Sequence, residues 1–357
     1  MGNLLKPLRL GSKILVVSNR KVASLFLKPV QRSLAQAGYE IVPPHLLRYG
    51  DERDKSTASL FSLWQHMAKV GLERTSTVVA LGGGVVGDLA GFAASTYMRG
   101  IPLVQVPTTL LAQVDAAIGG KTAIDLPEAK NIVGTFYEPR MVVMDVTALA
   151  RLNEFSTREV RNGFAEVIKY AVIQDRTLFD LLEKNLRHFR ESISKKKSLG
   201  ARELSFLENV IYRSARVKAK IVEEDERETK GKRLILNYGH TFAHAFEAAS
   251  QYRMPHGEAV ALGMVSAARL AHKRGLLARS EELRQSRLLQ ATGLPVTLGH
   301  SRFPFERLIR HMRLDKKKKY GKLRFVLPER IGKVRIVEDI SLSEIRPILK
   351  ELKGVRR

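Results

Sequence analysis

The sequence predicts an α/β fold for residues 1–150, followed by a mostly α-helical fold for residues 151–357. The length of 357 residues exceeds that of a typical single domain, so two domains are expected. In the first half, short apolar runs alternate with helical segments of about three turns, which is typical of a parallel sheet covered by helices. Beyond about Val146, long amphipathic stretches replace this pattern. We therefore place the domain boundary within Val146–Phe155.

The elements of the first half follow from the position of the apolar runs. Runs of four to six β-rich residues, such as KILVVS and STVVAL, indicate strands that are buried on both faces. The expected strands and extended segments are Lys13–Ser18, Tyr39–Pro43, Ser76–Leu81, Leu103–Val106 and Met141–Met144, and the expected helices are Val22–Ala37 and Leu60–Val70.

The second half contains few β-rich runs. Its amphipathic stretches have the period of helices with one buried face. They are Arg158–Phe189, Ala201–Glu224, His240–Gln251 and Glu258–Lys273, and a strand is expected at Leu323–Leu327.

The composition excludes several classes of function. The chain has no Cys, so disulfides and thiolate metal sites are excluded, and a transition metal must be held by His, Asp and Glu. No apolar run approaches the roughly 18–20 residues of a membrane-spanning helix. A cytoplasmic protein without a membrane partner is therefore expected.

The net charge of +25 is high, and such a field attracts anions. The basic residues are nevertheless scattered along the whole chain. The densest runs, Lys195–Lys197 and Lys316–Lys319, lack the interleaved aromatic residues that stack on bases. A solvated basic surface is therefore favoured over a nucleic-acid partner.

A glycine-rich turn is the first motif that points to a ligand. The expected strand ends at Leu81, and Gly82, Gly83 and Gly84 lead into a helix near Val86. Glycines allow close approach of a ligand to the backbone, and the helix N-terminus offers free N–H donors to a phosphate or pyrophosphate. The motif is not G-x-G-x-x-G, so a tight strand–helix turn is the alternative. Asp88 would face the ligand or interact with the helix dipole.

Further polar groups follow the next expected strand. Thr108 and Thr109 come directly after it, at the carboxyl end where α/β sheets bind ligands. Asp115, the Gly119-Gly120-Lys121 segment and the Lys130-Asn131 pair come next. Each signal is weak alone, but all of them predict polar groups at one edge of the sheet.

The helical half contains residues suited to a metal. Glu166 and Lys169 are three apart on one helix face, where Lys169 could simply pair with the carboxylate. His240 and His244 are spaced i, i+4, so both can point to one centre. His256 and Glu258 follow closely. Spacing alone selects His240 and His244 as ligands with His256 or Glu258 as the third, while structural histidines are the alternative.

Seven motifs together resemble those of the 3-dehydroquinate synthase family. They occur in the family's order between about Lys13 and Pro328, and they read LGGGVVGDLAGFAASTYMRG, VPTTLLAQVDAAIGGKTAID, AKNIVGTFYEP, GFAEVIKYAVI, LNYGHTFAHAFEA, HGEAVALGM and DKKKKYGKLRFVLP. The resemblance implies a Rossmann-like NAD domain joined to a helical domain that binds a metal, most often zinc and alternatively cobalt, and the substrate. It also leaves a homodimer possible.

The resemblance also implies roles for individual residues. It places the metal on Glu166, His240 and His256, and it turns His244 toward the substrate. NAD would be held by Glu52, Lys55, Gly83, Gly84, Val85, Gly87, Asp88, Thr108, Thr109, Lys121 and Lys130. The substrate would meet Arg99, Asp115, Asn131, Lys169, Lys218, Glu228, Arg233, Asn237, His244 and one of Lys316 and Lys317. Asn237 and His244 are seven apart, about two turns if one helix contains both.

The implied reaction converts an anionic sugar phosphate, 3-deoxy-D-arabino-heptulosonate 7-phosphate, to 3-dehydroquinate and phosphate in the shikimate pathway of aromatic amino acid biosynthesis. It would proceed through transient oxidation by NAD, phosphate elimination, reduction and aldol cyclisation, with NAD recycled. Alternatives are another sugar-phosphate cyclase, such as an inosose or valiolone synthase, and a metal-dependent polyol dehydrogenase.

Overall fold

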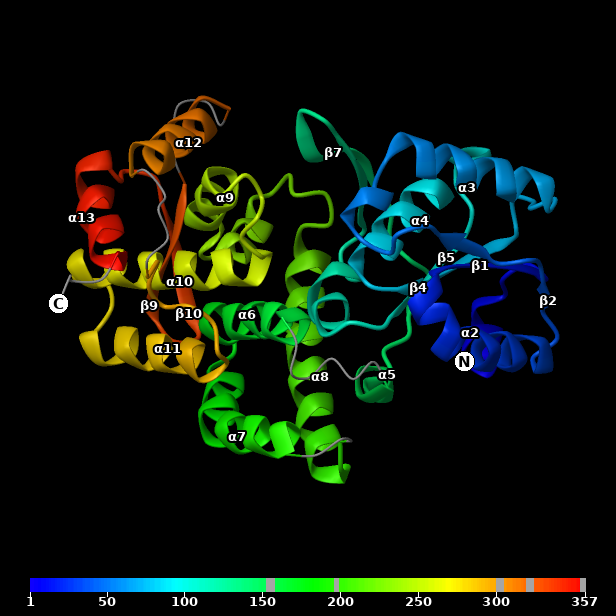
Figure 1. The fold of residues 1–357 in the computed structure, drawn as a ribbon, viewed down its shortest axis with the longest axis horizontal. Coiled ribbons are helices and arrows are strands. Elements are labelled where there is room, and N and C mark those ends of the chain that lie inside the picture. Colours follow the sequence, from blue (N-terminus) through cyan, green and yellow to red (C-terminus); the bar gives the residue numbers. More distant parts are fainter. Residues whose placement is uncertain (152–157, 196–198, 300–304, 319–323, 354–357) are drawn as a thin grey trace. The chain divides into compact units, whose positions relative to one another are not determined.

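A computed structural model describes residues 1–151, 158–195, 199–299, 305–318 and 324–353 (Figure 1). The chain forms two compact units, Met1–Asn153 and Glu154–Arg357. The first unit is α/β with a parallel sheet, and the second is mostly helical, as the sequence predicts. Residues 152–157, which include part of the expected boundary segment, lie outside the described residues.

The first unit is built on a parallel sheet with the strand order β2-β1-β4-β5-β8, and β3 also pairs with β1. The strands are β1 (Lys13–Asn19), β2 (Glu40–Ile41), β3 (His45–Leu47), β4 (Thr77–Gly82), β5 (Leu103–Pro107) and β8 (Met141–Val142). The predicted Tyr39–Pro43 segment contains β2. Gly82 at the end of β4 is in register with Pro107 at the end of β5. The glycine-rich turn and the threonine pair therefore leave the sheet side by side.

Both faces of this sheet are buried, which explains its unbroken apolar runs. Ile14 and Val16 of β1 pack into a core that includes Leu34 of α2 (Arg20–Gln36). Leu15 and Val17 point to the opposite core, which contains residues of α3 (Thr57–Lys69) and α4 (Gly84–Thr96). Alternate side chains of β1 thus pack into two cores, one on each face of the sheet. Helix α4, which follows β4 in the chain, packs into the core that contains Leu15 and Val17.

An antiparallel hairpin was not predicted from the sequence. It consists of β6 (Lys121–Leu126) and β7 (Ala129–Phe136), and β6 packs against α4. A short π-helical turn, η4 (Ala112–Ala116), precedes it. The remaining short elements of this unit are α1 (Gly2–Leu5), η1 (Lys6–Leu8), η2 (Glu52–Asp54), η3 (Tyr97–Arg99) and α5 (Val146–Arg151).

The second unit is organised around α10 (His256–Lys273), which contacts α6 (Arg158–Ile173), α9 (His240–Ala249) and strand β9 (Phe325–Arg330). A helix that is buried on nearly every side must be apolar all round, and between Ala259 and Ala268 the only polar side chain of α10 is the hydroxyl of Ser266. The N-terminus of α9 lies close against α10, because a Cβ on Gly263 would meet the carbonyl oxygen of Gly239 at 2.1 Å. This close approach positions the histidines at the starts of both helices.

The amphipathic stretch Arg158–Phe189 contains two helices in the structure, α6 and α7 (Arg176–Lys195). The stretch is helical, as its pattern predicts, but the pattern does not show where α6 ends. Asp175 interrupts it: its carboxylate accepts a hydrogen bond from the backbone N–H of Leu178 at 2.9 Å and pairs with Arg213 at 2.8 Å. A side chain that satisfies a free N–H of the next helix favours a new N-terminus over continuation.

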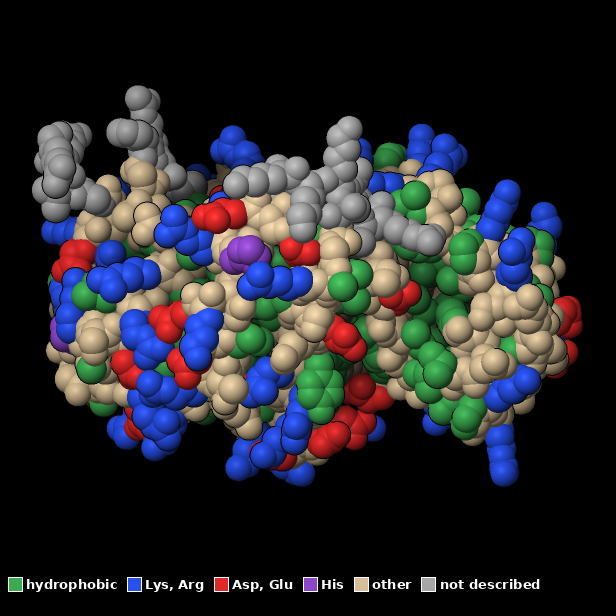
Figure 2. All heavy atoms as spheres, turned by 90° about the horizontal axis from the view of Figure 1, so that it is seen from below, with side chains coloured by type: hydrophobic (Ala, Val, Ile, Leu, Met, Phe, Trp, Pro, Cys, Tyr) green, Lys and Arg blue, Asp and Glu red, His purple; other side chains and the backbone are tan. Residues whose placement is uncertain are grey.

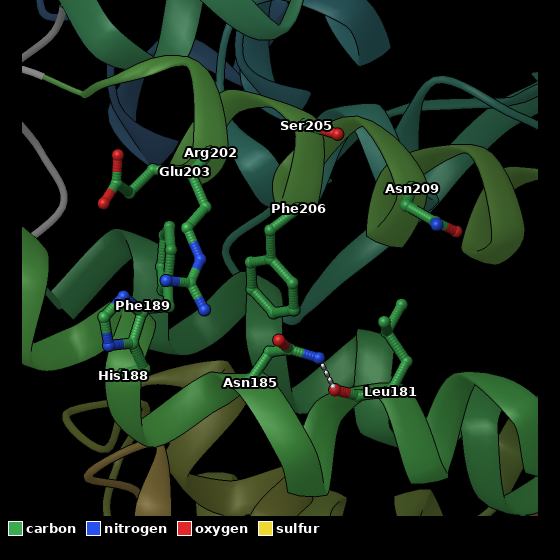
Figure 3. A pocket seen from close by; sticks show the side chains of 9 residues that line it. All are labelled: Leu181, Asn185, His188, Phe189, Arg202, Glu203, Ser205, Phe206 and Asn209. Atoms are coloured by element: carbon green, nitrogen blue, oxygen red, sulfur yellow. Dashed lines mark hydrogen bonds between the residues drawn. The ribbon is translucent and has the colours of Figure 1, made fainter.

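The other elements complete this unit. They are α8 (Ala201–Glu224), η5 (Lys232–Asn237), α11 (Arg279–Ala291), α12 (Phe305–Lys318), β9, β10 (Lys333–Val337) and α13 (Leu342–Leu352). A cavity of about 210 Å³ lies between α7 and α8 and is lined by side chains that include Asn185, His188, Arg202 and Phe206 (Figure 3). None of the predicted site residues lines it.

Lys and Arg side chains are spread over the face shown in Figure 2, with Asp and Glu between them. This distribution agrees with the scattered basic residues of the sequence. Among the described residues, no helix combines the length and apolar character that crossing a membrane requires.

Candidate functional site

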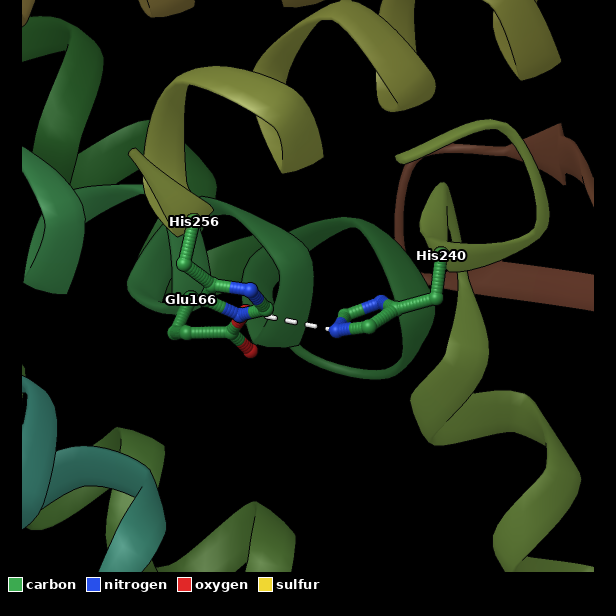
Figure 4. Close-up of side chains that lie close together, drawn as sticks. All are labelled: Glu166, His240 and His256. Atoms are coloured by element: carbon green, nitrogen blue, oxygen red, sulfur yellow. Dashed lines mark hydrogen bonds and ion pairs between the residues drawn. The ribbon is translucent and has the colours of Figure 1, made fainter. Parts of the chain in front are cut away.

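The three predicted metal ligands lie together in the second unit. Glu166 comes from α6, His240 from the first position of α9 and His256 from the first position of α10 (Figure 4). One donor atom from each lies within 4.8 Å of the other two. Oε1 of Glu166 is 3.3 Å from Nε2 of His256 and 3.6 Å from Nε2 of His240. Residues 90 positions apart in sequence therefore converge on one point.

The donor geometry fits a tetrahedral metal. Ligand bonds of about 2.0–2.2 Å at tetrahedral angles place neighbouring donors about 3.3–3.6 Å apart. The two Glu166–His distances fall in that range. Two imidazole nitrogens and one carboxylate oxygen are also the donor set of catalytic zinc sites that keep a fourth position open. The three residues thus fit a divalent metal such as zinc.

Burial controls the charge of these ligands. Burial lowers the pKa of His240 to about 3, so its ring is neutral, as a metal ligand must be. Burial also lowers the pKa of His256, but hydrogen bonds to Glu166 and Glu247 outweigh this effect and raise it to about 10. Without a metal, His256 is therefore an imidazolium ion between two carboxylates.

Lys169 forms an ion pair with Oε2 of Glu166, and both side chains are buried. The sequence left a simple pair of Lys169 and Glu166 as an alternative to a metal site, and the structure places this pair inside the unit. A carboxylate with no exposed surface requires a compensating cation, and Lys169 supplies it one turn along α6.

The spacing argument selected His244 as a ligand beside His240 and left Glu258 as a candidate for the third. The ring centroids of His240 and His244 are 5.7 Å apart, and Glu258 is 3.9 Å from Arg158. The cluster of donor atoms among the described residues contains His256 and neither of these two. In addition, α9 begins at His240 after Gly239, whose φ is 79°, and Asn237 ends η5. Asn237 and His244 are therefore not two turns apart on one helix.

Glu247 was missed by the sequence reasoning. Its Oε1 is 3.1 Å from Nδ1 of His256, on the side of the ring opposite Glu166. Its position seven residues after His240, on the same helix face, was the available signal.

Other predicted site residues of this unit lie at the end of α8 and beyond it. Arg233 is buried and is 3.3 Å from Oε1 of Glu228, which has a left-handed φ of 55°. The backbone N–H of Arg233 also donates to Asp225. Lys218 is buried on α8, and Asn237 is exposed. Lys316 and Lys317 are in the last turn of α12, and their side chains lie outside the described part of the structure.

The first unit forms a second polar site at the carboxyl edge of its sheet. Gly83 precedes α4 without a side-chain cap, so the first N–H groups of α4 have no partner from a capping side chain. A Cβ on Gly83 would lie 3.1 Å from Thr109, and one on Gly87 would lie 2.8 Å from Gln105. The hydroxyl of Thr108 is buried and has no hydrogen-bond partner among the described residues. These features fit a pyrophosphate-containing cofactor.

A network of charges lies beside this edge. Lys55 is buried and pairs with Asp88 at 2.7 Å, and it also donates to the side chain of Asn131. Burial lowers the pKa of Lys55, but Asp88 outweighs it and the net shift is upward. Glu52 lies 3.8 Å from Lys55 and 3.7 Å from Lys130. Asp88 therefore pairs with a side chain of its own unit.

The remaining predicted residues of this unit occupy the same edge or loops near it. Val85 is in the first turn of α4, Thr109 accepts a hydrogen bond from Ala112, and Asp115 is in η4. Lys121 begins β6 directly after two glycines with positive φ. Arg99 is exposed in a left-handed conformation with φ of 65°.

Solved structures with this fold include enzymes that contain both NAD⁺ and a divalent metal ion. A 2-epi-5-epi-valiolone synthase from Streptomyces hygroscopicus, solved with NAD⁺ and Zn²⁺, is 30% identical with a TM-score of 0.84 over 96% of this chain and 91% of that one. A 2-deoxy-scyllo-inosose synthase solved with carbaglucose-6-phosphate, NAD⁺ and Co²⁺ is 26% identical with a TM-score of 0.77 over 98% and 93%. This chain therefore shares the fold of sugar-phosphate cyclases, and its two donor sets agree with that class.

Sequence comparison identifies the family within this class. Residues 46–160 match the model of the 3-dehydroquinate synthase N-terminal domain, and residues 163–318 match that of the C-terminal domain. The 3-dehydroquinate synthase of Rippkaea orientalis is 43% identical over 98% of this chain and 92% of that protein. The chain belongs to the 3-dehydroquinate synthase family.

Proposed function

We propose that this chain converts 3-deoxy-D-arabino-heptulosonate 7-phosphate to 3-dehydroquinate and phosphate. The observation that carries the proposal is the convergence of Glu166, His240 and His256, with Lys169 paired to Glu166, in a chain that is 43% identical to a 3-dehydroquinate synthase over nearly its whole length. The enzyme is then a phosphate-eliminating lyase of aromatic amino acid biosynthesis.

Two cofactors follow from the donor sets. Glu166, His240 and His256 would hold the metal, for which zinc suits two nitrogens and one oxygen, with cobalt as an alternative. The first N–H groups of α4, together with Gly83, Gly84, Val85, Gly87 and Thr108, would hold NAD. When bound, the metal supplies a Lewis acid and NAD a reversible hydride acceptor.

The other NAD contacts that we propose are polar. Glu52, Lys55, Asp88 and Lys130 belong to the charge network beside α4, and Thr109 and Lys121 lie at the same edge of the sheet. The network fixes the side chains of Lys55 and Asp88 before any ligand arrives, which reduces the entropy lost on binding.

The substrate carries a carboxylate and a phosphate, and it requires charged donors at both ends. Arg99, Lys169, Lys218, Arg233 and one of Lys316 and Lys317 would supply them. Asp115, Asn131, Glu228, Asn237 and His244 would bind or activate its polar groups. Three of these residues, Arg99, Asn131 and Glu228, have left-handed φ values of 65°, 53° and 55°. Such strained residues gather at functional sites, and this supports their assignment.

The rival cyclases use the same fold. The identity of 43% to a 3-dehydroquinate synthase, against 30% and 26% to the valiolone and inosose synthases, favours the dehydroquinate reaction. The test supplies the purified chain with zinc, NAD and the seven-carbon substrate and measures released phosphate. Glucose 6-phosphate serves as the control substrate. The proposal is contradicted if glucose 6-phosphate releases phosphate and the seven-carbon substrate does not.

A polyol dehydrogenase would accumulate reduced cofactor, whereas the proposed cycle returns the hydride. We expect NAD to be needed only in trace amount and absorbance of NADH not to rise with released phosphate. One NADH for each phosphate would instead identify a dehydrogenase.

The location in the cell and the partners stay predictions. We expect a cytoplasmic enzyme whose basic surface does not bind nucleic acid at physiological salt, and a homodimer is the assembly to test. Binding of a DNA duplex that persists at that ionic strength would contradict the last expectation.

A further inference from the structure

A carboxylate that none of the assignments above uses lies directly behind a metal ligand. Glu247 is near the C-terminal end of α9, its side chain is 17% exposed, and its Oε1 is 3.1 Å from Nδ1 of His256. A negative charge at the C-terminal end of a helix interacts unfavourably with the helix dipole. The position of this charge is thus not explained by the stability of α9.

The hydrogen bonds behind the two histidines determine which nitrogen faces the metal. A carboxylate or carbonyl oxygen only accepts, so the nitrogen that bonds to it carries the hydrogen. Nδ1 of His256 donates to Glu247, and Nδ1 of His240 donates to the carbonyl oxygen of Tyr238 at 3.1 Å. Both Nε2 atoms then point to Glu166. The two hydrogen-bond acceptors differ, because the carboxylate of Glu247 is charged and the carbonyl group of Tyr238 is neutral.

The backbone after α9 brings these groups together at a conformational cost. Gln251 and Tyr252 both have left-handed φ values, 55° and 58°. The N–H of Tyr252 donates to the carbonyl oxygen of Glu247 at 2.8 Å, and this turn returns the chain to His256. Glu247 therefore holds the turn through its backbone and His256 through its side chain. Such left-handed strain persists only where the surroundings enforce it.

We propose that Glu247 is a positioning residue that orients the ring of His256 and strengthens its bond to the metal at the Glu166, His240 and His256 centre. This inference rests on the proposed function, which requires a metal there. A carboxylate behind a histidine raises the basicity of the ligating nitrogen and fixes the ring, and such partners commonly change metal affinity 10–100-fold. Its charge also attracts the cation directly.

The test measures zinc affinity by competition with a chromophoric chelator. Glu247→Ala removes the hydrogen bond and the charge, and we expect zinc affinity roughly 10–100-fold weaker than in the wild type. Glu247→Gln keeps an acceptor of the same shape, so its affinity should lie between the two. Glu258→Gln changes a carboxylate on α10 that is 3.9 Å from Arg158 and outside the donor cluster, and it should bind zinc like the wild type.

A second readout separates positioning of the ligand from general stability. With Co²⁺ in place of zinc, the absorption bands of the metal report its ligand field, and Glu247→Ala should shift them while Glu258→Gln should not. If Glu247→Ala does not fold, the zinc affinity and the Co²⁺ bands of Glu247→Gln decide whether Glu247 positions His256. Zinc affinity within about twofold of wild type and unchanged Co²⁺ bands in the Glu247 variants that fold would overturn the proposal. A wild-type chain that binds no zinc would instead overturn the proposed function.

Discussion

His244 lies one turn after His240 on α9, and it is exposed beside the metal cluster. Its spacing from His240 is the most conspicuous metal signal in the sequence. The structure shows why spacing misleads here, since the turn at Gln251–Tyr252 and the start of α10 bring His256 to the centre instead. Contacts of this kind depend on two elements that meet, and no periodicity within one helix reports them.

His244→Ala tests the substrate role that we propose for this residue. Loss of a polar partner for the sugar acid costs about 1–3 kcal/mol, so phosphate release should fall roughly ten- to a hundredfold. Bound zinc should stay at the wild-type stoichiometry, because His244 is not in the donor cluster. The assignment fails if His244→Ala loses zinc while His256→Ala retains it.

The lowered pKa of His45 predicts that the folded protein loses stability in acid. Burial lowers the pKa of this residue to about 4, with a smaller effect from His66, whose ring centroid is 5.3 Å away, and an opposing effect from Asp54. An unfolded chain has a His pKa near 6.5. Between these values the unfolded state binds more protons, so the free energy of unfolding decreases as pH falls from about 6.5 to about 4.

Urea unfolding at pH 7 and pH 4.5 measures this effect. We expect His45→Gln to reduce the difference in free energy of unfolding between the two pH values by about 1–3 kcal/mol. The exposed His188 offers a matched His→Gln control. Equal pH differences in wild type and His45→Gln would show that His45 does not contribute.

At the scale of elements, the sequence predicts the strands and helices whose pattern of apolar residues is local. Buried strands such as Lys13–Ser18 are found within one residue of their predicted ends, because burial on both faces requires an unbroken apolar run. The β6–β7 hairpin was missed, since seven of the eight residues of β7 are exposed and the strand has no apolar face to recognise. The break at Asp175 was missed for another reason: its cap is stabilised by Arg213, which belongs to α8.

Gly239 at the start of α9 is an element boundary that the metal site depends on. Its φ is 79°, and a Cβ there would lie 2.9 Å from the backbone nitrogen of Met264. Gly239→Ala should lower the free energy of unfolding by about 1–3 kcal/mol from strain alone, and more from this overlap. It should also weaken zinc binding, because His240 is the next residue.

Gly275→Ala is the matched control. Gly275 has a φ of 71°, and among the described residues no atom outside its chain neighbours lies within 4 Å of an added Cβ. Only left-handed strain of about 1–2 kcal/mol should result, with unchanged zinc affinity. The argument from close approach fails if urea titration gives the two variants equal midpoints.

At the scale of the whole molecule, each unit has apolar residues enough for a core of its own, and two of the three metal ligands stand at the first positions of α9 and α10. We therefore expect a chelator to abolish phosphate release and added zinc or cobalt to restore it. The thermal midpoint should fall by only a few degrees, since a catalytic site is not the core. Full activity of Glu166→Ala after chelation would contradict the assignment.

The buried pair of Lys169 and Glu166 has a consequence for the life of the chain before it is an enzyme. An isolated buried carboxylate would destabilise a newly made chain by several kcal/mol. Because Lys169 is an internal counter-ion of Glu166, we expect the second unit to fold before any metal binds and to take up zinc afterwards.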